Sequence, residues 1–159
     1  MKIYDVLHKD HEEAEALITK LEKKCADDDK DAPKLYQKIK TALTEHFNGE
    51  EKLFYSVIAQ GGFQEAIQRA ISQHDAVRST LGRLDGTIQN SAQAQPLVQE
   101  LKSRVVQHVQ FEETEVWDDG RKVIDAKQED RIGDEMLEAE PDVHPMRAKI
   151  AQFKEDMRT

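Results

Sequence analysis

Apolar residues recur at intervals of three and four along most of the chain, which is the spacing expected when one face of an α-helix is buried. Three stretches rich in polar and breaker residues interrupt this pattern: ADDDKDAP at 26–33, QGG at 60–62 and QNSAQAQP at 89–96. They leave four amphipathic segments joined by short connections, and short connections place successive helices antiparallel. The pattern therefore predicts an all-α protein with the fold of an up-down-up-down four-helix bundle.

Two prolines and the C-terminal region add detail to this prediction. Pro33 and Pro96 each close one of the interruptions, and we expect both in the first turn of a helix, where the missing N–H of proline has no intrahelical partner to lose. Beyond Trp117 the periodicity weakens, and residues 126–140 and 144–157 indicate one or two short helices. We expect a bundle domain over 1–118 and a C-terminal helical extension over 119–159 packed on it.

The two halves of the chain repeat each other. A histidine recurs 63 residues after His11, and a His-x-x-x-Glu motif that begins at His46 recurs after 62. The flanking segments IKTALTEHFNGEE and LKSRVVQHVQFEE also align. Two similar helical hairpins would be related by a pseudo-twofold axis and would present similar side chains to a shared centre.

Helical phase indicates which polar side chains face that centre. Successive residues of an α-helix are rotated by about 100°, so the side of each polar residue can be compared with the apolar stripe of its segment. On this comparison Glu51 and Glu113 rotate outward, whereas six residues lie on the inward faces: His11, His46, Glu50, His74, His108 and Glu112. Their separations from the connecting loops, at about 1.5 Å per residue, place all six in one layer of the bundle.

Burying these six residues without partners would be costly, because uncompensated buried charges either neutralise or destabilise the fold. A hydrogen-bonded polar layer is one solution, but six such residues in one layer, repeated in two halves, favour a metal site. A structural zinc ion takes four ligands, so six nitrogen and carboxylate donors indicate two ions bridged by the carboxylates. Imidazole and carboxylate suit iron, which we prefer, with manganese or zinc as substitutes.

Charge and composition exclude several other functions. The net charge is −9, which repels phosphate backbones and anionic lipid, so we expect no nucleic-acid partner and no membrane partner. The chain has neither the apolar run of a signal peptide nor that of a membrane span, and we expect a soluble, cytoplasmic protein. The single cysteine, Cys25, excludes an internal disulfide and is expected to be a small buried residue. The sequence identifies no protein partner.

The motifs that hold these residues resemble those of the hemerythrin-like family, the HHE cation-binding domains. The resemblance runs from about Ile3 to Val116. It rests on six residues in four motifs: His11 in LHKDHEEAE, His46 and Glu50 in HFNGEEKLF, His74 in ISQHD, and His108 and Glu112 in HVQFEE. It implies a four-helix bundle that holds a non-haem di-iron centre, bridged by carboxylates and by an oxo or hydroxo group. The resemblance also implies that such a centre interacts with dioxygen or nitric oxide.

The chain departs from the oxygen-carrying hemerythrins at two positions. Those proteins have a second histidine one turn further along the third helix, where this chain has Arg78, and a final aspartate at plus five, where it has Glu112 at plus four. Four histidines and two glutamates resemble instead a bacterial subgroup that includes the iron-sulfur cluster repair proteins. Those repair proteins carry a cysteine-containing segment before the first helix, whereas this sequence starts directly with that helix.

We therefore expect a di-iron protein that binds dioxygen or nitric oxide for sensing, storage or detoxification. One alternative is a di-iron enzyme that reduces nitric oxide or peroxide, or that donates iron for cluster repair. Another is a metal-free or zinc-stabilised helical interaction domain. Enzymatic turnover is left open by the sequence.

Several residues around the predicted centre have more than one interpretation. His8, one turn before His11, has three interpretations: a fifth histidine ligand, a hydrogen-bond partner of a ligand, or a solvated side chain. Arg78 offers its charge to a bound anion or points to solvent. His144 is expected to be unrelated to the metal. Five aromatic residues line an access route, position a bound small molecule or belong to the core: Tyr4, Phe54, Tyr55, Phe111 and Trp117.

Overall fold

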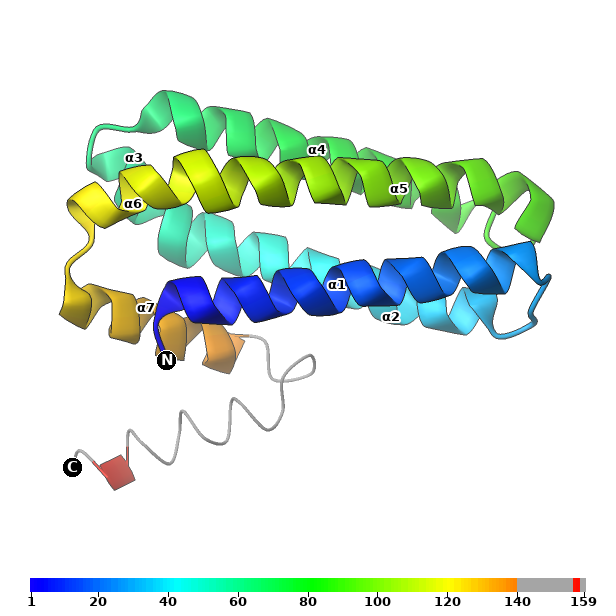
Figure 1. Cartoon of the computed structure of the whole chain (residues 1–159), viewed down its shortest axis with the longest axis horizontal. Coiled ribbons are helices and arrows are strands. Elements are labelled where there is room, and N and C mark those ends of the chain that lie inside the picture. The colour runs from blue at the N-terminus through cyan, green and yellow to red at the C-terminus, as the bar shows by residue number, and fades with distance from the viewer. Residues whose placement is uncertain (140–155, 158–159) are drawn as a thin grey trace.

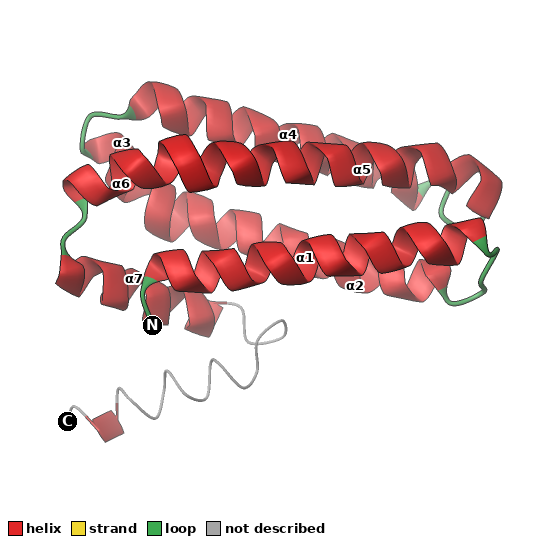
Figure 2. Cartoon of the chain, in the orientation of Figure 1, coloured by secondary structure: helices red, strands yellow, loops and turns green. Residues whose placement is uncertain are grey.

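The computed structural model describes residues 1–139 and 156–157, and within these residues the chain contains helices and no strand (Figure 2). Successive long helices run in opposite directions (Figure 1). The four are α1 (Ile3–Ala26), α2 (Ala32–Gly49), α4 (Gln64–Asp85) and α5 (Ser91–Phe111). The predicted all-α, up-down-up-down bundle is therefore confirmed.

The helices α2 and α5 each change from α to π geometry at equivalent positions of the repeat. After α2 the chain continues through the π segment η1 (Glu50–Tyr55) into α3 (Ser56–Gln60). After α5 it continues through η2 (Glu112–Val116) into α6 (Trp117–Val123). A π turn is closed by i→i+5 hydrogen bonds, so it is wider than an α turn, and such turns occur mostly at functional sites.

Both prolines were predicted to lie in the first turn of a helix, and the structure confirms this for only one of them. Pro33 lies in the first turn of α2, as predicted. Pro96 lies inside α5, because that helix already begins at Ser91, and the prediction of a loop over 89–96 was wrong. The reason is Asn90, whose side-chain oxygen accepts a hydrogen bond from the backbone N–H of Gln93 at 3.1 Å and caps the helix.

The C-terminal extension includes the helix α7 (Ala126–Ala139), which packs beside α1 (Figure 1). The terminal ammonium of Met1 donates to Asp134 at 3.2 Å, and a Cβ at Gly133 would collide with the Met1 carbonyl oxygen. Glycine thus permits the close approach of the two segments. The helix expected over 144–157, and with it His144, lies outside the described residues except for 156–157. The division at residue 118 stays a prediction.

Two hydrophobic clusters fill the bundle and leave a polar layer between them. Cluster I occupies the end formed by the α1–α2 and α4–α5 connections, and its largest fully buried members are Tyr36, Ile18, Leu21, Ile39, Leu84 and Leu101. Cluster II occupies the other end, under α7, and its largest fully buried members are Tyr55, Phe54, Ile3, Leu7, Ile58 and Ile132. Along α1, α4 and the continuous segments α2–η1 and α5–η2, each buried histidine lies between members of the two clusters.

No helix among the described residues combines the length and the apolar character that crossing a membrane requires.

Candidate metal centre

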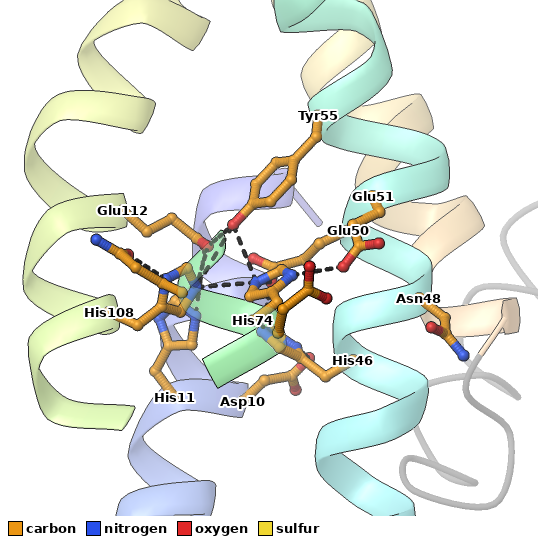
Figure 3. A network of polar contacts seen from close by, with 12 residues as sticks. Asp10, His11, His46, Asn48, Glu50, Glu51, Tyr55, His74, His108 and Glu112 are labelled. Carbon is orange, nitrogen blue, oxygen red and sulfur yellow. Dashed lines mark hydrogen bonds and ion pairs between the residues drawn. The ribbon is translucent and has the colours of Figure 1, made fainter. Parts of the chain in front are cut away.

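The six residues predicted to face inward come together in the layer between the two clusters (Figure 3). The Glu50, Glu112 and His74 side chains are fully buried, and the other three histidines are at most 5% exposed. α1 and α4 each contribute one histidine, α2 and α5 contribute one each in their last turns, and each π segment begins with one glutamate. The repeat seen in the sequence is thus a repeat of the site.

Each glutamate lies between histidines that come from different helices. Glu50 Oε1 is 3.2 Å from His46 Nε2 and 3.1 Å from His74 Nε2. Glu112 Oε1 is 3.4 Å from His11 Nε2, and its Oε2 is 3.1 Å from His108 Nε2. Both carboxylates therefore connect the first half of the chain with the second.

Several atoms turned toward this centre lack a hydrogen-bond partner within the part of the chain that the structure describes. They are Nε2 of His11, Nε2 of His46, both carboxylate oxygens of Glu50, and Oε1 of Glu112. Buried polar atoms without partners are rare in folded proteins, and here five of them converge on one place. Imidazole nitrogen and carboxylate oxygen are good ligands for iron, manganese and zinc, so the donor set fits metal ions.

The ligand atoms form two groups that share Glu50. Within each group, one ligand atom from every residue lies within 4.8 Å of the others. We call these groups the His11/His46 position and the His74/His108 position, after the histidines they contain. Glu50 belongs to both groups and Glu112 to the second, although Glu112 Oε1 also reaches His11. Each of the two groups has the donor atoms to hold a metal ion.

The outer nitrogen of each of the four histidines in the layer lies near a hydrogen-bond acceptor. In each case Nδ1 is close enough to donate: His11 to Glu113 at 2.8 Å, His46 to Asp10 at 3.2 Å, His74 to Glu51 at 2.7 Å and His108 to Gln73 at 2.7 Å. Such contacts select the Nδ1–H tautomer, so the Nε2 lone pair of each ring points inward. They also fix the orientation of the ring and raise its basicity as a ligand.

Glu51 and Glu113 correct the prediction that these residues rotate outward. Their side chains are 27% and 21% exposed, and each reaches back to bond a histidine of a neighbouring helix. Uniform α-helical phase misplaces them because the turn widens into π geometry at the glutamate just before each one. The signal that could have found them is the doubled glutamate, which occurs in both halves.

His8 and Arg78 lie outside the ring of histidines. The His8 side chain is 54% exposed, and its Nδ1 is 2.9 Å from Glu113. Arg78 donates to Glu51 at 2.7 Å and to Asp75 at 2.9 Å. Each residue therefore contacts the carboxylate that holds one histidine, and neither reaches the centre in this structure.

Without metal, the electrostatics of the site favour protonation of His11 and His46. Burial alone would lower the pKa of His11, but the carboxylates of Glu112 and Glu113 outweigh it and raise the pKa to about 9. For His46 the same competition, between burial and the carboxylates of Glu50 and Asp10, leaves the pKa well above its usual range. Metal ions must displace these protons, so their uptake depends on pH.

Tyr55, one of the five aromatic residues with more than one interpretation, contacts the predicted ligands themselves, which the sequence did not show. Its hydroxyl hydrogen-bonds Glu112 Oε2 and lies 3.3 Å from His74 Nε2 (Figure 3). In a regular α-helix, five residues rotate by about 140°, which would turn Tyr55 away from the face of Glu50. The wider π turn over Glu50–Tyr55 brings it back. Of the other aromatic residues considered, Tyr4, Phe54 and Trp117 are buried in cluster II and Phe111 packs against it.

A helical bundle with a buried histidine and carboxylate centre defines a class of metal-binding proteins. Residues 2–117 match the family described as the Hemerythrin HHE cation binding domain, and because this match covers most of the chain, the protein belongs to that family. Neither among curated proteins nor among solved structures is there a significant match. The family and the buried centre together indicate a metal-binding protein.

Proposed function

We propose that the protein holds two non-haem iron ions at this centre and binds dioxygen or nitric oxide there, for sensing, storage or detoxification. The observation that carries the proposal is the arrangement of six inward donors as two histidine pairs joined by two carboxylates. One ion would be held by His11 and His46, and the other by His74 and His108. When bound, ferrous iron supplies an open coordination position and electrons for a diatomic ligand.

The protein's own residues would keep this centre rigid and dry. The four Nδ1 contacts hold the imidazole rings in one orientation, so the ligand atoms are in place before the metal arrives. Cluster I and cluster II close the layer at its two ends, which limits the access of water from those ends. A water-poor site limits side reactions of a bound diatomic molecule.

Anaerobic reconstitution with ferrous iron tests the proposal. We expect about two irons per chain, followed by stoichiometric uptake of nitric oxide or dioxygen. The double variant Glu50→Ala/Glu112→Ala should lose the iron, because both shared carboxylates are gone. A matched control removes two exposed carboxylates, Glu115→Ala/Glu135→Ala, and should keep it. A wild-type chain that takes up no iron, or a double variant that retains two, would contradict the proposal.

Turnover separates binding from the enzymatic alternative. A binding protein saturates after one equivalent of ligand per centre, whereas an enzyme that reduces nitric oxide or peroxide consumes substrate repeatedly when an external reductant is supplied. Metal analysis of freshly purified protein addresses the remaining alternative, because an interaction domain would contain zinc or no metal.

A further inference from the structure

The two halves of the centre differ at one equivalent pair of aromatic residues. Tyr55 follows Glu50 by five residues, and Trp117 follows Glu112 by five. Both rings stack on a histidine: Tyr55 on His74 with centroids 5.3 Å apart, and Trp117 on His11 with centroids 6.3 Å apart. The pseudo-twofold repeat therefore places a phenol on one side of the centre and an indole on the other.

Only one of these two rings carries an oxygen atom. The Tyr55 hydroxyl contacts Glu112 Oε2 and lies 3.3 Å from His74 Nε2 and 3.5 Å from His108 Nε2. It is thus surrounded by the ligand atoms of the His74/His108 position. Indole nitrogen is a donor only and offers no lone pair to a metal, so Trp117 has no comparable role at the His11/His46 position.

A cavity reaches the centre, and Tyr55 is not among the residues that line it. It has a volume of about 610 Å³ and lies between α1, α2 and α5. His11 and His46 both line it, together with apolar residues that include Ala14, Leu17 and Ala42. His108 touches the same cavity, whereas His74 and Tyr55 are not part of its wall.

From these observations we propose that the centre is asymmetric. Tyr55 Oη is an additional ligand of the ion at the His74/His108 position, and the small ligand binds to the ion at the His11/His46 position, which it reaches through the cavity. As the bond from oxygen to metal forms, the hydroxyl proton leaves to solvent and the tyrosine binds as phenolate. This inference rests on the proposed di-iron function and assigns different roles to its two ions.

Visible absorption of the iron-loaded chain tests the tyrosine. After oxidation with ferricyanide, wild type should show the phenolate-to-iron charge-transfer band in the visible region. Tyr55→Phe should lose this band and still hold two irons, and Tyr4→Phe, which alters a buried tyrosine of cluster II, should keep it. Two bound irons without the band in wild type, or a band that survives in Tyr55→Phe, would overturn the assignment. Wild type without iron would overturn the di-iron proposal and this inference with it.

The route to the ligand position is tested by filling the cavity. Ala42→Phe should slow nitric oxide binding to the ferrous chain by at least about tenfold, because access then requires a rearrangement. The iron content and the charge-transfer band should not change, which shows that the fold is intact. Ala66→Phe, at a partly buried alanine of α4 outside the cavity wall, should bind nitric oxide at the wild-type rate. Equal rates in Ala42→Phe and wild type would overturn the proposed route.

Discussion

Cluster I and the polar layer are carried by the same four helices, but burial affects them in opposite ways. Leu21, Leu84 and Leu101 in cluster I are fully buried, and their removal from water is itself favourable. Tyr36 is buried with them, and its hydroxyl donates to the Leu81 carbonyl oxygen at 2.6 Å. The buried hydroxyl of cluster I therefore finds its hydrogen-bond partner within the chain itself.

In the polar layer, by contrast, burial leaves requirements that the chain does not meet alone. Inward nitrogen and oxygen atoms of His11, His46, Glu50 and Glu112 have no hydrogen-bond partner among the described residues. The inward nitrogen and oxygen atoms approach one another to 3.1–3.4 Å, but without a proton or a metal ion between them their lost hydration is not replaced, at a cost of about 1–3 kcal/mol each. The difference teaches that cluster I stabilises the bundle under all conditions, whereas the layer stabilises it only when protons or metal ions occupy the centre.

Metal removal should change the free energy of unfolding more than any of the substitutions that follow. A ligand that binds only the folded chain at a thousand times its Kd adds about 4 kcal/mol to the free energy of unfolding, so two ions would add about 8 kcal/mol. Urea unfolding under anaerobic conditions, with ferrous iron or with a chelator, measures the difference. Equal unfolding midpoints in the two conditions would show that the layer is satisfied without metal.

Truncation of cluster I should lower stability equally with and without metal. Leu101→Ala removes a fully buried side chain and should reduce the free energy of unfolding by about 2–5 kcal/mol. Leu97→Ala, at a partly buried position of the same helix, should cost less. The comparison is made by urea unfolding of both variants in both metal states. A loss that depends on the metal state would mean that cluster I and the layer are not independent.

The metal-free layer should respond to pH, and cluster I should not. The pKa of His11 is raised from 6.5 to about 9 in the folded chain, so its stabilising effect is fully present below pH 6.5 and is lost as the pH rises to about 9. A shift of this size corresponds to about 3 kcal/mol. Unfolding of the metal-free chain from pH 6 to pH 10 should show this decrease, and His11→Leu should reduce it. With metal bound, Nε2 carries no proton to lose, so a decrease of equal size would contradict the assignment.

The bundle and its inward residues could be predicted because they follow from helical periodicity. Apolar spacing and short connections define four antiparallel helices, and a phase of about 100° per residue places His46 and Glu50 on the buried face. The repetition of this motif at His108 and Glu112 then requires a common centre. These signals are local in the sequence or are repeated in it.

The parts that could not be predicted depend on departures from regular periodicity or on contacts between helices. The π segments change the phase after Glu50 and Glu112, so the inward position of Tyr55 and the contacts of Glu51 were not visible in a uniform helix. Asp10 bonds His46 from another helix, and no short-range pattern predicts that contact. The effect of these outer residues on metal affinity is therefore the smallest effect that we predict for the layer.

Glu113 offers that test, because it touches His11 but not the centre. Its carboxylate accepts from His11 Nδ1 at 2.8 Å, which orients the ring. Glu113→Ala should weaken metal binding by about 10–100-fold, or roughly 1.4–2.7 kcal/mol, and Glu113→Gln should weaken it less because an acceptor remains. Metal titration against a competing chelator measures both, with the exposed Glu115→Ala as control. If Glu113→Ala binds metal as tightly as Glu115→Ala, the inner ligands alone set the affinity. The outer residues would then contribute nothing to metal binding, and the layer would depend only on the residues within it.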